Sequence, residues 1–92
     1  MSAVTAIILV RCEGSRLVQV AQALVDLEEV HEVYSVSGDV DVIVIVRFKE
    51  FDEIADIIPN KIAQIPGVVK TSTYVAFRQY SRRDIDDVFD LD

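Results

Sequence analysis

The sequence predicts an α+β fold, in which a four-stranded antiparallel sheet carries two helices on one face. The first observation is the order of the hydrophobic patterns along the chain. β-branched apolar stretches, typical of strands, and amphipathic stretches, typical of helices, follow one another as β-α-β-β-α-β. Right-handed crossovers convert that order into the ferredoxin-like arrangement. The second observation is a weak internal repeat, since residues 43–47 resemble residues 7–11. The predicted strands are residues 4–10, 30–37, 40–48 and 68–77.

The predicted third strand is apolar on both of its faces. Side chains alternate along a strand, so one face receives Val42, Val44 and Val46. The other face receives Ile43 and Ile45. A chain of this length can cover one face with its own helices, and the second face then needs another copy of the protein. We therefore expect a homodimer that packs sheet to sheet.

The predicted first helix follows a break at residues 11–14, with Ser15 as its side-chain N-cap. Residues 28–29 end this helix. Its apolar stripe at helical spacing consists of Leu17, Ala21, Leu24 and Val25.

The predicted second helix contains a proline. Pro59 removes one backbone hydrogen bond, so we expect the helix to kink there or to split into two short pieces. Residues 66–67 end the helix. The apolar stripe consists of Phe51, Ile54, Ala55, Ile58, Ile62 and Ile65.

Length and composition predict one domain at residues 1–80, followed by a charged tail at residues 81–92. The tail contains apolar residues spaced like one or two helical turns, at positions 85, 88, 89 and 91. No apolar run approaches the roughly 20 residues that a membrane span needs. The N-terminus has none of the features of a signal peptide. We expect a cytoplasmic protein without a membrane partner.

Charge and cysteine content exclude several classes of function. The net charge of −7 argues against direct binding of nucleic acid, and the only basic cluster, Arg78 with Arg82 and Arg83, is followed at once by acids. Cys12 is the only cysteine, which excludes an intrachain disulfide and a Cys/His zinc site. We therefore expect no metal and no cofactor, and we interpret Cys12 as a small packed side chain.

Three stretches carry a resemblance to a known family: residues 33–41 (VYSVSGDVD), 65–68 (IPGV) and 71–73 (TST). In order and spacing they resemble the effector-binding domain, or RAM domain, of the Lrp/AsnC transcription regulators. That resemblance covers residues 3–77 and implies sheet-to-sheet dimers, further assembly into rings, and amino acids bound between dimers. Regulators of this family carry an N-terminal helix-turn-helix domain, and we expect this chain to lack a DNA-binding domain of its own. The resemblance also implies a full-length Lrp/AsnC regulator as a partner.

A site for a free amino acid needs acceptors for the ammonium group and donors for the carboxylate. Carboxylates at 39 and 41 are acceptors, the backbone at Gly38 allows close approach, and hydroxyls at 71–73 are donors. By resemblance, Gly38, Asp39 and Asp41 occupy the Gly-x-x-Asp turn of the family. The predicted ligand-binding residues are Gly38, Asp39, Val40, Asp41, Gln64, Thr71, Ser72 and Thr73. The competing interpretation is structural, because Gly-Asp is also an ordinary hairpin turn and threonine is common in strands.

Two other functions remain open at the level of sequence. Ferredoxin-like dimers also include small enzymes, and that function requires a pocket between the helices and the sheet, lined with polar groups. An apolar pocket that contains the only histidine, His31, would favour it. We interpret His31 as a surface residue and predict no catalytic residue. The other alternative is an assembly module that binds no ligand.

Overall fold

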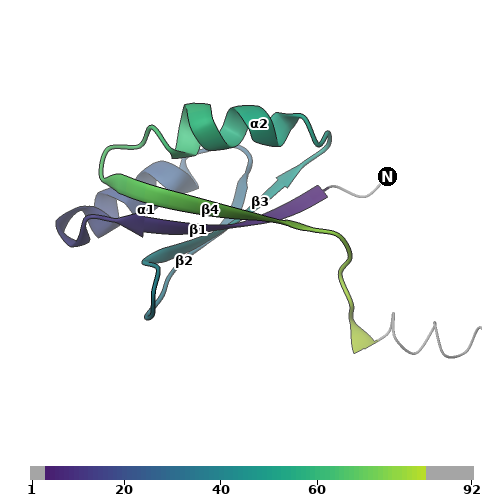
Figure 1. Ribbon diagram of the computed structural model, residues 1–92, viewed down its shortest axis with the longest axis horizontal. Coiled ribbons are helices and arrows are strands. Elements are labelled where there is room, and N and C mark those ends of the chain that lie inside the picture. The colour runs from purple at the N-terminus through teal and green to yellow at the C-terminus, as the bar shows by residue number, and fades with distance from the viewer. Residues whose placement is uncertain (1–3, 83–92) are drawn as a thin grey trace, which may run out of the picture.

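Residues 4–82 are described by a computed structural model, and they form one antiparallel sheet with the strand order β2-β3-β1-β4 (Figure 1). The strands are β1 (Val4–Cys12), β2 (Val30–Ser35), β3 (Val42–Phe48) and β4 (Val68–Ala76). The two stretches that resemble each other in sequence are the neighbouring central strands, since Ile7 pairs with Ile45 and Leu9 with Ile43. The predicted fold class is confirmed.

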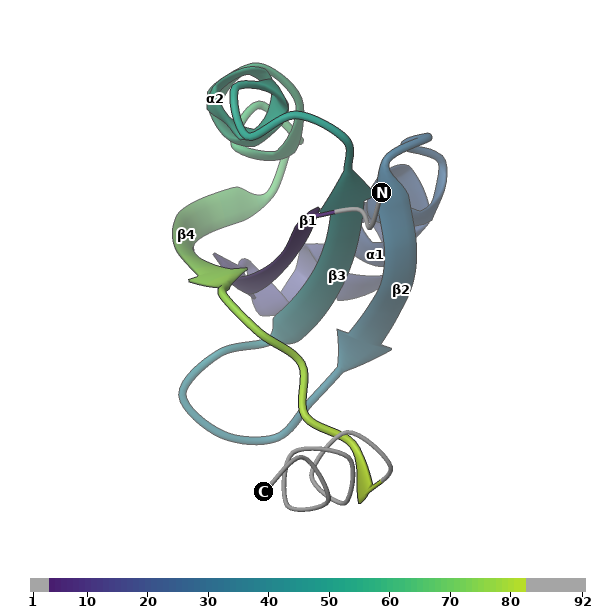
Figure 2. The same cartoon turned by 90° about the vertical axis from the view of Figure 1, so that its right-hand side faces the viewer.

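The helical segments lie on one face of the sheet. They are the 3₁₀ turn η1 (Gly14–Arg16), α1 (Leu17–Val25), α2 (Glu53–Ile57) and the π-helical turn η2 (Ile58–Ile62). Figure 2 shows α2 on the side of β4 and α1 on the side of β2. No described helix is long and apolar enough to cross a membrane.

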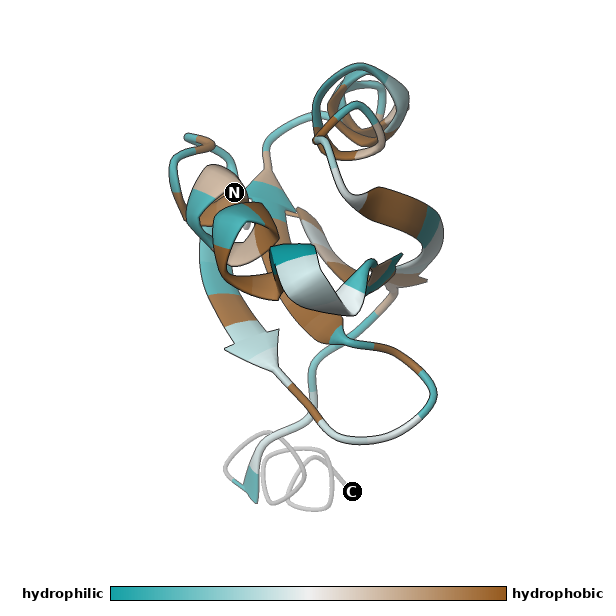
Figure 3. Ribbon diagram, turned by 90° about the vertical axis from the view of Figure 1, so that its left-hand side faces the viewer, coloured by the Kyte–Doolittle hydropathy of each residue, from teal (hydrophilic) through white to brown (hydrophobic). Residues whose placement is uncertain are grey.

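The core lies between the helices and this face of the sheet. Ile8 and Val44 are cross-strand partners, and both side chains are 0% exposed. Helices contribute Val20 and Leu24 from α1, Ile57 from α2 and Ile62 from η2. In Figure 3 the ribbon of α1 alternates between hydrophilic and hydrophobic residues, as expected of a helix with one buried side.

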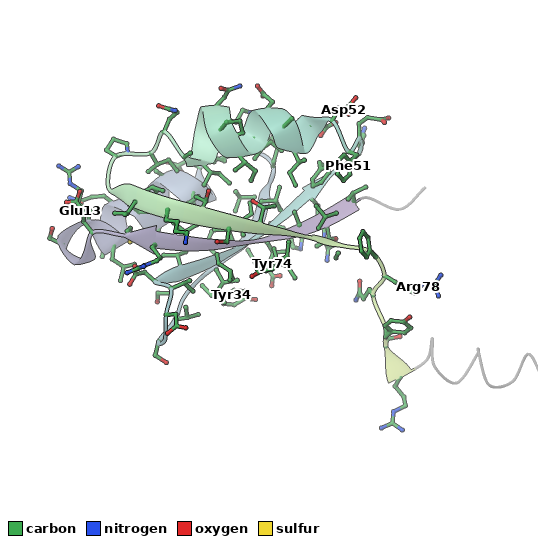
Figure 4. The ribbon with its side chains drawn as sticks, viewed as in Figure 1. Glu13, Tyr34, Phe51, Asp52, Tyr74 and Arg78 are labelled. Atoms are coloured by element: carbon green, nitrogen blue, oxygen red, sulfur yellow. The ribbon has the colours of Figure 1, made fainter. Side chains whose placement is uncertain are left out.

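The opposite face of the sheet, called here the open face, is covered by no described helix. The centre of this face consists of two cross-strand pairs, and each of the four side chains is half-buried: Ile7 with Ile45 and Leu9 with Ile43. Tyr34 and Tyr74 flank this centre with 49% and 57% of their surface exposed, and both point away from the helices in Figure 4. Both faces of β3 are therefore apolar, as predicted, and a single copy covers one of them.

The start of α1 differs from the prediction. Ser15 is no N-cap, because the amide of Arg16 donates to the carbonyl of Glu13 (2.8 Å) and the chain first forms η1. Arg16 occupies the N-cap position of α1 without a side-chain hydrogen bond. The first strand also continues to Cys12 rather than ending before residue 11, because it stays paired with β4 there.

The predicted stripe of α1 is displaced around the helix. Val25 is 63% exposed, whereas Val20, which the stripe omits, is 0% exposed. At 3.6 residues per turn, Val20 lies about 40° around the helix from Leu24, and Val25 lies about 100° away. The helix also ends at Val25, before the predicted end at residues 28–29.

The second helix splits at Pro59, as predicted. The α-helical part ends at Ile57, and η2 is closed by the amide of Ala63 donating to the carbonyl of Ile58 (2.8 Å). This wider turn accommodates a proline that has no amide proton. The predicted stripe is wrong at Phe51, which is 60% exposed because it precedes the helix, and at Ala55, which is exposed on α2. It also omits the buried Ile57.

Candidate functional site

The predicted ligand-binding turn is a loop rather than a tight hairpin. We call residues 36–41 the β2–β3 loop, since β2 ends at Ser35 and β3 begins at Val42, inside the bounds predicted for both strands. The amide of Val36 donates to the carbonyl of Asp41, and the amide of Asp41 donates to the carbonyl of Val10, both at 3.0 Å. These bonds close the base of the loop and attach it to β1, one of the two central strands.

Gly38 gives the loop its shape. Its φ of +129° is a conformation that residues with a side chain rarely adopt. The space around it is open, since a Cβ built there would meet no heavy atom within 4 Å. A substitution at Gly38 therefore strains the backbone without a steric clash.

Asp41 has a structural hydrogen bond. Its Oδ2 accepts from the amide of Cys12 at 2.9 Å, which joins the base of the loop to the end of β1. The same carboxylate, with that of Glu13, adds to the effect of burial, which raises the pKa of the Cys12 thiol. Cys12 therefore stays protonated at neutral pH, as suits a packed side chain.

The tip of the loop faces solvent. Asp39 is exposed, and its carboxylate accepts no hydrogen bond from the described part of the chain. Val40 is half-buried. The amides of residues 37–40 donate to no backbone carbonyl within residues 4–82. The tip of the loop therefore carries one carboxylate acceptor, that of Asp39, and the backbone amide donors of residues 37–40.

The turn at residues 65–67 lies at the same end of the sheet as the loop. Gly67 has a φ of +100°, and its carbonyl accepts from the amide of Glu13 at 2.9 Å. A Cβ on Gly67 would lie 2.9 Å from Cβ and from Cδ of Arg16. The glycine allows the chain to enter β4 directly against the start of the α1 segment.

The three predicted hydroxyls of β4 do not converge. Thr71 and Thr73 pair with Val10 and Ile8 and share the helix-covered face, whereas Ser72 pairs with Leu9 on the open face. Thr71 and the start of β3 flank Val10 on opposite sides. Two strand spacings, about 10 Å, therefore separate Thr71 from the base of the loop within one copy.

Gln64 follows η2 and is exposed. Its side-chain amide donates to the carbonyl of Pro59 at 3.2 Å, so part of its hydrogen-bonding capacity serves the helix end. Within one copy, no described contact joins Gln64 to the β2–β3 loop. The predicted site residues thus remain a prediction that depends on how copies assemble.

Sequence reasoning did not identify an ion pair that joins the turn before β2 to η2. Nζ of Lys61 lies 2.5 Å from Oε2 of Glu29, and hydrogen bonding to Lys61 lowers the pKa of the Glu29 carboxyl. Oε1 of Glu29 is buried and accepts no hydrogen bond from the described residues. The two residues are far apart in sequence, so no local pattern reveals the pair.

The surface of the described residues contains grooves. One, of about 620 Å³, lies between α1 and β2 and is lined by Leu17, Ala21, Val33 and other residues. Another, of about 570 Å³, lies on the open face. His31, exposed at an irregularity of β2, lines neither groove. Among the described residues, no group of three or more potential ligands can hold a metal ion.

Comparison with known proteins identifies the family. The model of the Lrp/AsnC ligand binding domain matches residues 5–85. The FL11 transcriptional regulator of Pyrococcus abyssi is 35% identical over 75 residues, which cover 82% of this chain and 49% of that protein. The LrpA regulator of the same species is 42% identical over 55 residues, covering 60% of this chain and 39% of the regulator. This chain spans about half the length of the curated relatives it matches.

Solved structures agree with the sequence comparison. The protein TTHA0845 from Thermus thermophilus superimposes with a TM-score of 0.81 at 39% identity, covering 86% of this chain and 99% of that one. AsnC of Escherichia coli shares the fold with a TM-score of 0.78 at 22% identity, covering 83% and 52%. The curated relatives are named as HTH-type transcriptional regulators. The chain belongs to the Lrp/AsnC family, and residues 5–85 correspond to the ligand-binding domain of that family.

Proposed function

We propose that this domain binds a free amino acid at the tip of the β2–β3 loop and that the bound amino acid controls how copies assemble. The observation that supports this most directly is the loop itself. Its base is closed by hydrogen bonds to β1, and its tip presents the Asp39 carboxylate beside the backbone of Gly38. A ligand therefore meets a preformed site rather than a segment that must first become ordered.

Both ends of an amino acid find complementary groups at this tip. The Asp39 carboxylate accepts hydrogen bonds from the ammonium group, and the amides of residues 37–40 donate to the carboxylate. Among proteins of this fold, the regulator NMB0573 of Neisseria meningitidis was solved in complex with L-Met. Its identity of 14% carries the fold alone, and the ligand class is our proposal.

Assembly follows from the open face. The half-buried Ile7, Leu9, Ile43 and Ile45 form one apolar surface, and packing two copies sheet to sheet removes it from water. In our proposal, such dimers associate further into rings, and the hydroxyls of β4 and Gln64 of one dimer complete the site formed by the loop of another.

The partner of the domain, in our proposal, is a second copy or a full-length Lrp/AsnC regulator that offers the same sheet surface. The net charge of −7 on this chain repels DNA, so in our proposal the DNA contacts belong to a full-length regulator and not to a second copy. In our proposal the assembly is cytoplasmic, which is supported by relatives that are named as HTH-type transcriptional regulators.

Calorimetric titration of the protein with each of the 20 common amino acids tests the proposal. We expect one chemical class of amino acid to bind, and we expect Asp39→Asn to weaken that binding at least tenfold, because the ammonium loses a charged acceptor. Asp52→Asn is the matched control: Asp52 is also exposed, lies on the helix-covered side and makes no side-chain cap. Absence of heat from all 20 amino acids at 5 mM would overturn the proposal.

A further inference from the structure

The segment that follows β4 leaves the body of the molecule. We call residues 77–82 the arm. Phe77, its first residue, is 100% exposed, and Tyr80 is 65% exposed. The sequence predicted that β4 would extend to residue 77, but the strand ends at Ala76 and the amides of residues 77–80 donate to no backbone carbonyl within residues 4–82. Two large aromatic side chains thus remain in solvent in a single copy.

The direction of the arm is informative. In Figures 1 and 4 the chain turns after β4 away from α2 and toward the side to which Tyr34 and Tyr74 point. That side is the open face. A second sheet packed on the open face lies about 10 Å below the first, so the arm extends into the layer that a second copy would occupy.

The arm and the open face together enclose the groove of about 570 Å³. Its floor is apolar, with Ile7 and Ile45, and its walls carry charges of both signs, Glu32 on one strand and Arg47 on another. The arm contributes Phe77, Arg78 and Gln79. The groove is therefore continuous with the apolar surface through which we propose that the domain dimerises.

Charge favours a second copy of this chain as the occupant. Residues 77–82 contain Arg78 and Arg82 and no acidic residue, whereas residues 1–76 contain six basic and eleven acidic side chains, a net charge of −5. A basic arm is attracted to the acidic body of another copy, and the two arms of a symmetric dimer make that contact twice.

We propose that the arm of each copy clasps the other copy in the sheet-to-sheet dimer, with Phe77 and Tyr80 packed against the partner. The inference rests on the dimer of the proposed function and adds to it the segment that holds the dimer together. Because both aromatic side chains are exposed in the single copy, their removal costs the fold of that copy little.

Sedimentation equilibrium of the full chain over a range of concentrations tests the clasp. We expect the double variant Phe77→Ala, Tyr80→Ala to raise the dimer dissociation constant at least tenfold and to leave the far-UV circular dichroism unchanged. Phe51→Ala is the matched control, because Phe51 is an aromatic residue of similar exposure (60%) before α2, on the helix side of the sheet (Figure 4). Equal dissociation constants for the wild type and the double variant would overturn the clasp while leaving the proposed dimer intact. A wild type that is monomeric at every concentration would overturn both.

Photo-crosslinking identifies what the arm contacts. Copies of the variant Tyr80→benzoylphenylalanine labelled with ¹⁴N are mixed with copies labelled with ¹⁵N, and the crosslinked peptides are identified by mass. Mixed-label peptides that join position 80 to β1, β2 or β3 support the clasp. Crosslinks confined to a single label would show that the arm folds back on its own chain, and would overturn the inference even if the protein is a dimer. The same experiment at position 51 is the control.

Discussion

At the scale of single residues, two glycines and one aspartate determine the geometry around the proposed site. Gly38 and Gly67 are the described residues with positive φ, and they lie in the two turns that meet at the same end of the sheet. Asp41 joins one of these turns to β1 through the amide of Cys12. The Gly-x-x-Asp pattern therefore has a structural meaning whatever the loop binds, because both residues hold the loop in place.

Substitution of Gly67 should destabilise the protein. Gly67→Ala combines a strained φ of +100° with a Cβ only 2.9 Å from side-chain atoms of Arg16, and we expect a loss of about 1–3 kcal/mol in the free energy of unfolding. The control is Gly14→Ala, where a Cβ meets nothing within 4 Å. Urea unfolding at one fixed protein concentration measures both. Equal stability of the two variants would contradict this account of Gly67.

At the scale of elements, the strands could be predicted from the sequence because alternation of apolar residues is a local signal. The three hydroxyls of β4 follow the same rule, since alternation alone places Ser72 on the face opposite to Thr71. Element ends could not be predicted in this way. The segment between β1 and α1 is held by a hydrogen bond from the amide of Glu13 to the carbonyl of Gly67, and the base of the β2–β3 loop by one from the amide of Asp41 to the carbonyl of Val10. Such partners are distant in sequence, so no window around the element contains them.

The ion pair between Glu29, in the turn before β2, and Lys61 of η2 predicts how stability changes with pH. Because hydrogen bonding to Lys61 lowers the pKa of Glu29 in the folded state, the pair stabilises the protein above the ordinary glutamate pKa of about 4.3. That contribution is lost as the pH falls through the lowered pKa. We expect Lys61→Met to lose a small part of its stability at pH 7, because the pair is partly exposed, and to lose less further stability than the wild type below pH 4.

Lys49→Met controls for the loss of a positive charge, since Lys49 is exposed and forms no ion pair within residues 4–82. Urea unfolding at pH 7 and at pH 3 compares the three proteins. If Lys61→Met and the wild type lost the same stability between these two values, the ion pair would not be the cause.

At the scale of the whole molecule, the sheet has one buried face and one exposed face. The helices bury the face that carries Val42, Val44 and Val46, each 0% exposed. On the open face, Ile43 and Ile45 alternate with them along the same strand and remain half-exposed. The sequence predicts this asymmetry because two short helices cannot cover two faces. It does not predict the direction of the arm, which depends on where pairing with β1 ends.

A charge on the open face should separate the copies without unfolding them. Ile45→Glu places a carboxylate at the centre of the proposed interface, and we expect the dimer dissociation constant to rise at least a hundredfold because the charge would be buried without a partner. Val18→Glu is the control on the helix side, where Val18 is already 68% exposed. Light scattering after size-exclusion chromatography measures the mass of each. A dimer that persists in Ile45→Glu would show that the copies associate through another surface.

The strand order leaves β2 and β4 as the two edges of the sheet, and face-to-face packing pairs neither of them. Such edges invite the unlimited side-by-side addition of strands that leads to fibres. Here β2 loses its regular register at His31, and β4 carries an exposed Lys70. An edge strand with an irregular register and an edge strand with an exposed charge both resist the addition of further strands. The single histidine therefore lies where it helps to keep an assembly of these sheets finite.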